Sequence, residues 1–458
     1  MGRIVGLALA ALLVGAVVAL ALFPDLRARL RRPSPGRAVA GPANPVLVGA
    51  TGYLGYLRDG DGYVVDIALG STQRATRSGG VSLLRVAPSG NFVSFARNNR
   101  LFVAKSDGTA EFEMAEGDQP ESARWASHNV ALVYSSKSGS LQVFDPRAGQ
   151  FGQRMIDPPG SGVGPNVAWS SSGARIAYER RKPVSSTVTR DGIWIVNTSH
   201  STPVSSPIFM SSGQVGLRLC CWSSNDQYVL FWQVALDGEG LATVGRLLIA
   251  ESDGSEPVEV SASTLLLPGI VGHGGIGQVV PLIEGGSRQW GDAKTLVATQ
   301  PGSAPAGNLI VRRGVLEDSD RLSPGSPSIS LDGTQVAFSI GPSLASVGGD
   351  PVQPMVGRRI WIVGVDGKRK RSLLADATVP RGVSDDLPKW SRDGRTIVFA
   401  RRLSPGAQSG SAGRSGQLEA WVAYADGSNA RRLIGNLEDP GVNGSGTIDY
   451  GVSFDYQP

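Results

Sequence analysis

The stretch that decides the fold is WSRDGRTIVFA, which runs from Trp390 to Ala400. It begins with an aromatic residue and a serine, passes through an Asp-Gly pair at Asp393 and Gly394, and ends in an apolar run. Asp-Gly favours tight hairpin turns, because glycine adopts a positive φ without steric cost. A short run rich in β-branched and aromatic residues after such a turn predicts a β-strand. The stretch therefore predicts a β-hairpin whose first strand ends at Trp390.

The same phrase recurs along the chain. We call the first residue of each copy its anchor, and the seven anchors are separated by 39, 44, 53, 68, 39 and 61 residues. Repeats of this length are typical of folds built from one repeated supersecondary unit. Besides WSRDGRTIVFA, the copies are VAPSGNFVSF from Val86, WASHNVALVY from Trp125, WSSSGARIAY from Trp169, WSSNDQYVLF from Trp222, WGDAKTLVAT from Trp290 and ISLDGTQVAF from Ile329.

A further strand follows each copy, as in RIWIVGVDGK from Arg359 and EAWVAYADGSN from Glu419. Most of these strands end in Asp-Gly, which is again a hairpin signal. Short alternating strands separated by turns, repeated at this spacing, predict the four-stranded blades of a β-propeller. The fold class that we expect is therefore all-β.

The two ends of the repeat differ from its middle. Residues 53–69 read as two strands of a further blade without a leading anchor strand, and the tail IDYGVSFDYQP reads as a strand with no blade after it. We expect the tail to supply the missing inner strand and to close the ring, because closure removes free sheet edges. The prediction is an eight-bladed propeller. Seven blades are the alternative, because the copies at Trp125 and Trp290 are degenerate.

The repeated phrase, followed by an Ile-Trp-Ile-Val strand ending in Asp-Gly, resembles the TolB-type, WD40-like (PD40) β-propeller repeat. The resemblance covers nearly all of residues 46–458, but the chain lacks the α/β domain that precedes the propeller in TolB proteins. It implies a scaffold that binds a protein or a cell-envelope component. The repeat tryptophans are expected to pack between neighbouring blades as structural anchors, namely Trp125, Trp169, Trp222, Trp290 and Trp390.

The amino terminus carries a different signal. Residues 4–23 contain no charge, and 20 residues of helix span roughly 30 Å of hydrocarbon. We expect a short tail at 1–3, a transmembrane anchor at 4–23, an Arg/Pro/Gly linker at 24–45 and the propeller at 46–458, with a cleaved signal peptide as the alternative. The arginines after the span favour a cytoplasmic body by the positive-inside rule. The resemblance favours the extracytoplasmic side of the cell membrane, which we adopt.

Composition excludes several classes. With 41% hydrophobic residues the chain is not disordered overall, and two cysteines cannot form a disulfide scaffold. The adjacent Cys220 and Cys221 are expected to be free thiols. A balance of 44 basic against 39 acidic residues gives a net charge of +5, which does not by itself indicate nucleic acid. We expect no nucleic-acid partner.

The loops that join the second and third strands of the blades are long and varied, whereas the hairpin turns at the other face are short. Long loops on a rigid scaffold are where binding usually occurs. These loops carry more basic than acidic residues, so we expect an anionic protein or envelope component to bind there. The residues that we name for this basic face are Arg180, Arg181, Lys182, Arg358, Arg359, Arg401 and Arg402.

The sequence offers no recognised catalytic motif. It contains no G-x-S-x-G nucleophile elbow, and His128, His200 and His273 are too far apart to form a zinc-binding helix motif. We therefore expect no catalytic residue, no metal site, no cofactor and no enzymatic activity. The alternative is a propeller enzyme, a hydrolase or lyase that acts on a glycan in the central channel.

Overall fold

The computed structural model describes most of the chain from Ala50 to Pro458. Residues outside the description are 1–49, 115–118, 128, 184–188, 200–202, 212–214, 224–225, 236–243, 266–270, 273–279, 286–294, 299–307, 312–321, 331, 333, 343–356, 365–367, 376–378, 381, 404–416 and 438–453. Both the predicted membrane segment at 4–23 and the anchor Trp290 lie outside the described residues.

The described residues form eight four-stranded antiparallel sheets. The first contains β3 (Ser71–Arg74), β2 (Asp61–Asp66), β1 (Tyr53–Arg58) and β32 (Phe454–Gln457). The second runs through β4 (Val81–Val86), β5 (Phe92–Arg97), β6 (Arg100–Lys105) and β7 (Glu111–Glu113). The third contains β8 (Arg124–Trp125), β9 (Leu132–Ser135), β10 (Leu141–Phe144) and β11 (Gln153–Asp157).

The next two sheets follow in chain order. The fourth contains β12 (Val163–Trp169), β13 (Arg175–Pro183), β14 (Thr189–Asn197) and β15 (Ser205–Met210). The fifth contains β16 (Val215–Trp222), β17 (Tyr228–Ala235), β18 (Val244–Glu251) and β19 (Val258–Leu265).

The last three sheets repeat this order. The sixth contains β20 (Val271–Gly272), β21 (Val280–Gly285), β22 (Thr295–Ala298) and β23 (Asn308–Val311). The seventh contains β24 (Leu322–Ile329), β25 (Gln335–Pro342), β26 (Arg359–Gly364) and β27 (Arg371–Ser372). The eighth contains β28 (Val383–Trp390), β29 (Thr396–Leu403), β30 (Gln417–Tyr424) and β31 (Arg431–Leu437).

Helix is almost absent from the described residues. They hold two short 3-10 helices, η1 (Pro120–Ser122) and η2 (Pro146–Phe151). No helix in this part of the chain has the length and apolar character needed to cross a bilayer. The prediction of an all-β chain made of four-stranded sheets is confirmed.

The serine that follows the anchor in several copies of the repeated phrase has a structural role. The serine after the anchor accepts a hydrogen bond from the backbone N–H five residues later, as Ser391 Oγ does from Thr396 at 3.0 Å and Ser330 Oγ from Gln335 at 3.0 Å. The turn between them needs a left-handed residue, and Gly394 has a φ of +69°. The serine and the glycine together fix the hairpin between the first and second strands of a sheet.

Apolar clusters join each sheet to its neighbours. Leu54 and Tyr56 of the first sheet share a buried cluster with Val398 and Leu418 of the eighth. Similar clusters join the first sheet to the second, the second to the third, the third to the fourth, the fourth to the fifth and the seventh to the eighth. The core is thus divided among the spaces between sheets.

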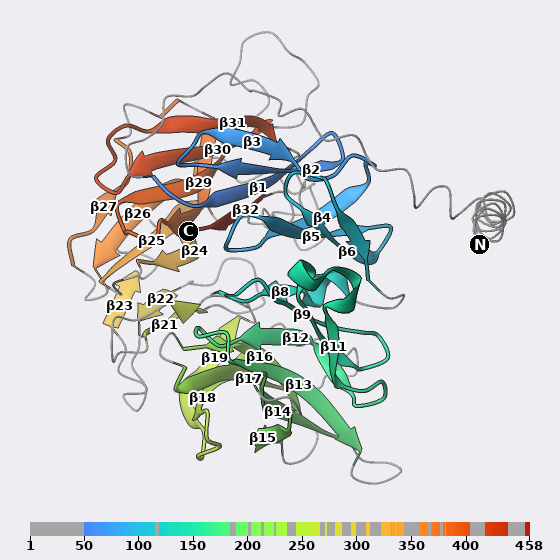
Figure 1. Cartoon of the computed structure of the whole chain (residues 1–458). Coiled ribbons are helices and arrows are strands. Elements are labelled where there is room, and N and C mark those ends of the chain that lie inside the picture. The colour runs from blue at the N-terminus through green and yellow to red at the C-terminus, as the bar shows by residue number, and fades with distance from the viewer. Residues whose placement is uncertain are drawn as a thin grey trace, which may run out of the picture.

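One edge strand of each sheet lies toward the middle of the molecule. Figure 1 shows β12, β16, β24 and β32 there, whereas β15 and β31 lie at the rim. Neighbouring edge strands contact one another, as β4 does with β32 and β8, and β12 with β8 and β16. We call these the inner strands, namely β4, β8, β12, β16, β20, β24, β28 and β32.

Candidate functional site

One of the arginines expected on the basic loop face, Arg401, forms a buried ion pair in the eighth sheet. Arg401 donates two hydrogen bonds to the carboxylate of Asp385, at 2.6 and 2.8 Å, and both side chains are almost fully buried. The guanidinium also lies 4.0 Å from the ring centroid of Trp421. The two hydrogen bonds engage the planar fork of the guanidinium, and the stacking covers one of its flat faces.

Arg358 and Arg359 are also engaged within the protein. Arg358 is buried, forms an ion pair with Asp386 at 3.2 Å, and donates to Ser339. Arg359 donates to the backbone carbonyl of Val383 at 2.7 Å. Arg402 is buried as well. These four residues of the predicted set therefore stabilise the seventh and eighth sheets.

The other members of the predicted set belong to the fourth sheet. Arg180 lies over the ring of Trp194 at 4.6 Å and 3.5 Å from Asp157. Arg181 pairs with Asp191 at 2.9 Å and keeps half of its side chain exposed. Lys182 lies in β13, and its side chain is outside the description. The structure thus divides the seven predicted residues between the fourth sheet and the last two sheets, and their role in binding stays a prediction.

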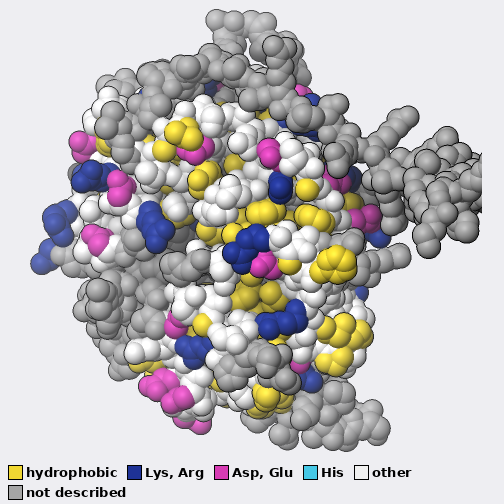
Figure 2. All heavy atoms as spheres, in the orientation of Figure 1, with side chains coloured by type: hydrophobic (Ala, Val, Ile, Leu, Met, Phe, Trp, Pro, Cys, Tyr) yellow, Lys and Arg dark blue, Asp and Glu magenta, His cyan; other side chains and the backbone are white. Residues whose placement is uncertain are grey.

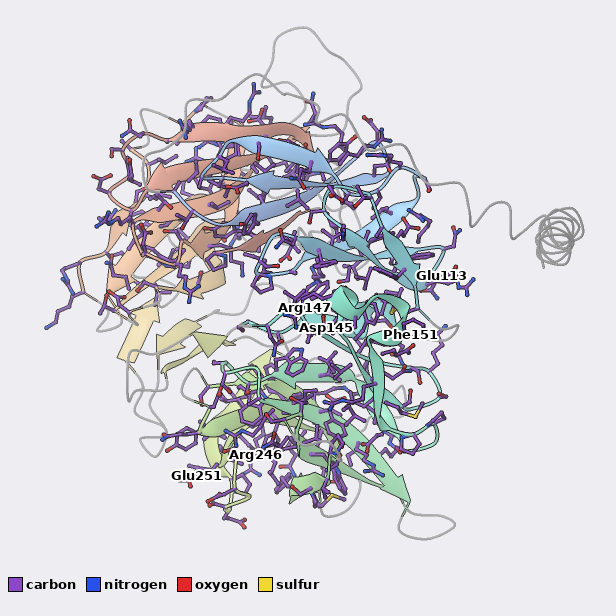
Figure 3. All side chains as sticks on the ribbon, viewed as in Figure 1. Glu113, Asp145, Arg147, Phe151, Arg246 and Glu251 are labelled. Carbon is purple, nitrogen blue, oxygen red and sulfur yellow. A yellow bond between two sulfur atoms is a disulfide. The ribbon has the colours of Figure 1, made fainter. Side chains whose placement is uncertain are left out.

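The basic residues are also dispersed on the part of the surface that is in view. Figure 2 shows basic and acidic side chains interspersed over the face in view, without a large patch of one sign. Figure 3 places Asp145 and Arg147 beside each other near η2, where they form an exposed ion pair, and Phe151 further along the same segment. Phe151 is 84% exposed. Nothing in the structure shows what would cover it.

A different set of residues converges at the inner strands. Wherever the structure describes it, the residue immediately before a repeat anchor, or before the matching Tyr456 in β32, is at least partly exposed although it lies on an inner strand. We call it the pre-anchor residue. Since it lies between packed sheets near the middle of the molecule, its access to solvent indicates a water-accessible space there. The pre-anchor residues are Arg85, Arg124, Ala168, Cys221, Ser328, Lys389 and Asp455.

The repeat tryptophans fix the backbone of this layer. Trp125 Nε1 donates to the carbonyl of Arg85 at 3.2 Å, and Trp169 Nε1 donates to that of Arg124 at 3.0 Å. Each indole therefore holds the pre-anchor carbonyl of the preceding sheet. The same bond links Trp222 to Ala168 at 3.0 Å and Trp390 to Ser328 at 3.1 Å.

Four pre-anchor residues are charged and come from four neighbouring sheets. They are Lys389 on β28, Asp455 on β32, Arg85 on β4 and Arg124 on β8. Arg85 and Asp455 both act electrostatically on Arg124 and on Lys389, so each of these two cations lies within electrostatic reach of Arg85 and Asp455. We call these four residues the inner-strand charge cluster. It contains three cations and one anion.

Asp455 is the acidic member of the cluster. Its Oδ2 accepts hydrogen bonds from the backbone N–H of Val86 at 2.9 Å and from Gln457 Nε2 at 3.0 Å. Arg124 donates to the backbone carbonyls of Glu121 and Ala123, at 2.6 and 2.9 Å. The four residues of the cluster thus carry three positive charges and one negative charge.

The pKa values of two of these cations, Arg124 and Lys389, are lowered. Burial lowers the pKa of Arg124 to about 10, with Arg85 acting in the same direction and Asp455 and Glu121 against it. Burial also lowers the pKa of Lys389, where Asp455 opposes the shift and Arg85 adds to it. Desolvation and like charge both disfavour the protonated form. An added anion would relieve both costs.

A bulge positions Lys389. The pairing of β28 with β29 shifts register between Asp386 and Lys389, and Leu387 has a φ of +51°. Positive φ is costly for a residue with a branched side chain, so the surrounding packing must hold it. Register shifts also occur in β4, β12, β16 and β24 before the anchor. A register shift before the anchor is thus shared by five of the inner strands.

The cysteines differ from expectation. Cys220 and Cys221 are joined by a disulfide, so the expectation of free thiols is wrong. Cys221 occupies the pre-anchor position of β16, where the register shifts between Leu219 and Cys221. Within the part of the chain that the structure describes, no group of three or more His, Cys, Asp or Glu side chains has a metal-binding arrangement.

Comparison with known proteins gives no family by sequence. No family model matches the chain, and no curated protein matches it. Among solved structures, an oligogalacturonate lyase from Vibrio parahaemolyticus is similar at 11% identity and a TM-score of 0.41, over 77% of this chain and 95% of that one. A putative TolB from Agrobacterium tumefaciens is similar at 12% identity and a TM-score of 0.33, over 84% and 90%.

A third similar structure is the β-propeller domain of Cps50 (Swd1) from Myceliophteria thermophila, at 12% identity and a TM-score of 0.40, over 71% of this chain and 95% of that one. The eight four-stranded sheets of the described residues support a propeller fold, and the PD40 repeat itself stays a prediction. The likenesses include a lyase and prolyl endopeptidases, which are enzymes. This finding overturns our expectation that the chain is not an enzyme. That expectation was based only on the lack of a recognised catalytic motif.

The sequence contained a signal for the cluster that we did not use. Each pre-anchor residue stands directly before an anchor, so aligning the copies places Arg85, Arg124 and Lys389 at one repeat position. Only the structure shows that this position reaches solvent and that these sheets are neighbours.

Proposed function

We propose that this chain is a β-propeller that binds an anionic ligand at the inner-strand charge cluster. The observation that carries the proposal is the cluster itself, three cations and one acid at equivalent positions of neighbouring inner strands. Arginine presents a planar fork that suits carboxylate and phosphate groups. The excess positive charge attracts an anion and is relieved when one binds.

The larger architecture in this proposal is an eight-bladed ring closed by β32 and attached to the cell membrane through residues 4–23, with the propeller on the extracytoplasmic side. Eight described sheets and the pairing of β32 with β1 support the ring. The apolar run at 4–23 supports the attachment. The ligand would be an acidic group of a protein or of a cell-envelope component, or a substrate if the site is catalytic.

The test uses the full chain in detergent and inorganic phosphate or citrate as probes at low ionic strength. We expect both probes to raise the melting temperature and to bind measurably by calorimetry, because a ligand specific for the folded state stabilises it. Arg85→Gln and Arg124→Gln should each weaken binding about tenfold, which corresponds to about 1.4 kcal/mol.

Arg181→Gln is the matched control, because it removes an arginine whose side chain is half exposed and remote from the cluster. Binding should be unchanged in this variant. Equal losses in Arg181→Gln and Arg85→Gln, or no binding of either probe to the unaltered chain, would reject the proposed site.

Ring closure has its own test. Deleting residues 454–458 removes β32 and exposes the edge of β1. We expect the melting temperature to fall by many degrees, whereas Asp455→Asn should change it little. If the truncated chain melted like the intact one, closure by the tail would be excluded.

A further inference from the structure

Lys389 differs from the other members of the inner-strand charge cluster in its contacts. Its side chain has surface open to solvent although surrounding atoms enclose it closely enough to desolvate the amine, and it makes no hydrogen bond or ion pair with any described residue. Arg124 is held by backbone carbonyls, and Asp455 by Val86 and Gln457. Lys389 is therefore open to solvent, and no described residue bonds to its amine.

The surroundings of Lys389 favour the neutral amine. Enclosure by the inner strands lowers its pKa, Asp455 acts against this, and Arg85 reinforces it. An amine becomes a better nucleophile when it is desolvated or placed next to another cation, because both effects reduce protonation. The bulge at Leu387 and the bond from Trp390 to Ser328 hold the adjacent backbone in place.

We propose that Lys389 is a reactive lysine that forms an imine with anionic carbonyl compounds, such as aldehydes or keto acids, whose acid group is held by Arg85 and Arg124. This inference rests on the proposed function and names the ligand class of the same site. The neutral amine attacks the carbonyl carbon and gives a carbinolamine. Loss of one water then forms the C=N bond, so no oxidant or reductant is needed.

The division of roles follows from the residue types. Arginine keeps its charge and binds an acid group through a bidentate fork, whereas lysine loses its proton when desolvated and can react. Asp455 lies on the inner strand between those of Lys389 and Arg85 and remains available to accept a hydrogen bond through Oδ1, which has no described partner. One wall of the space therefore carries an anion-binding part and a nucleophilic part.

The test treats the full chain in detergent with pyridoxal 5′-phosphate, an anionic aldehyde, followed by borohydride to reduce the imine. Peptide mass spectrometry then gives the labelling rate of each lysine. We expect Lys389 to be labelled at least tenfold faster than any other lysine, and inorganic phosphate to slow its labelling. Pyridoxal, which lacks the phosphate, should label Lys389 at least fivefold more slowly than pyridoxal 5′-phosphate does.

Lys370 is the internal reference, because burial alone lowers its pKa and no arginine contributes. Lys389→Arg keeps the charge and should abolish the labelling while phosphate still binds. Arg85→Gln should slow labelling of Lys389 by pyridoxal 5′-phosphate to the rate seen with pyridoxal.

Two results would overturn the inference in different ways. Phosphate binding that depends on Arg85, together with labelling of Lys389 no faster than that of Lys370, would reject the reactive amine and leave the anion site standing. Equal labelling of Lys389 by pyridoxal and pyridoxal 5′-phosphate, without phosphate binding, would reject both the anion site and the imine proposal.

Discussion

Two groups of basic residues in this protein have opposite surroundings. In the eighth sheet Arg401 is buried, paired with Asp385 through two hydrogen bonds and stacked on Trp421. In the inner-strand charge cluster three cations accompany a single acid, Asp455, and all four side chains are at least partly exposed. The comparison teaches that an arginine count does not identify a binding surface. Pairing and access to solvent decide whether a cation only stabilises the fold or can also meet a ligand.

The largest effect that separates the two groups is the cost of losing one charge. Arg401→Ala leaves the carboxylate of Asp385 buried without a partner, and breaking such a pair costs about 3–5 kcal/mol. Urea unfolding should show this loss, whereas Lys389→Ala should cost far less. The double variant Arg401→Met with Asp385→Leu should recover most of the stability. A stable Arg401→Ala protein would remove the distinction.

Glu179 is an intermediate case, because its carboxylate is buried but its cation, Arg218, lies 3.8 Å away. Burial raises its pKa from 4.5 to about 7, with Arg218 and hydrogen bonds from Asn166 and Leu219 opposing the shift. The folded state therefore holds the proton more tightly than the unfolded state. The contribution of Glu179 to stability should be complete below pH 4.5 and fall by about 3 kcal/mol as pH rises through 7.

Unfolding free energies measured at pH 5 and pH 8 test this expectation. Glu179→Gln should remove most of the difference and stabilise the protein at pH 8, since the amide carries no charge. Glu111→Gln, at an exposed ion pair, is the control and should leave the difference intact. The assignment to Glu179 fails if both variants keep the same pH dependence.

The third prediction joins the scaffold to the charge cluster. Trp125→Phe removes the hydrogen bond from the indole to the carbonyl of Arg85 and keeps most of the packing. A lost hydrogen bond of this kind costs about 1 kcal/mol. We expect that loss in urea unfolding and a parallel weakening of phosphate binding. Trp222→Phe is the control. The indole of Trp222 bonds to the carbonyl of uncharged Ala168, so this variant should spare phosphate binding.

The smallest effect concerns the cations of the cluster. Lys389→Met removes one of three neighbouring positive charges and relieves repulsion, so stability should stay within about 0.5 kcal/mol of the unaltered protein or rise. Salt should stabilise the unaltered protein more than the variant, because screening weakens repulsion between accessible charges. A loss of several kcal/mol would show that Lys389 is as structural as Arg401.

The repeat made the fold predictable. The alternating strands, the Asp-Gly turns and the unpaired strand at each end predicted four-stranded sheets and placed the tail beside residues 53–69. The sites were harder to predict, because pairing is a tertiary property. Asp385 lies opposite Arg401 in the predicted hairpin only because the register shifts between Asp386 and Lys389, which the sequence does not indicate. The disulfide between Cys220 and Cys221 also contradicted expectation.

The pairing of β1 with β32 has a mechanical consequence. Tyr53 lies opposite Gln457, so the described chain starts and ends at the same end of this antiparallel pair. Tension applied between the two ends would load the bonds one after another, like a zipper, rather than all at once in shear. A fluorescent protein fused after Pro458 would stand beside the point where the amino-terminal segment enters, and the same geometry would make this seam the first place to open under force.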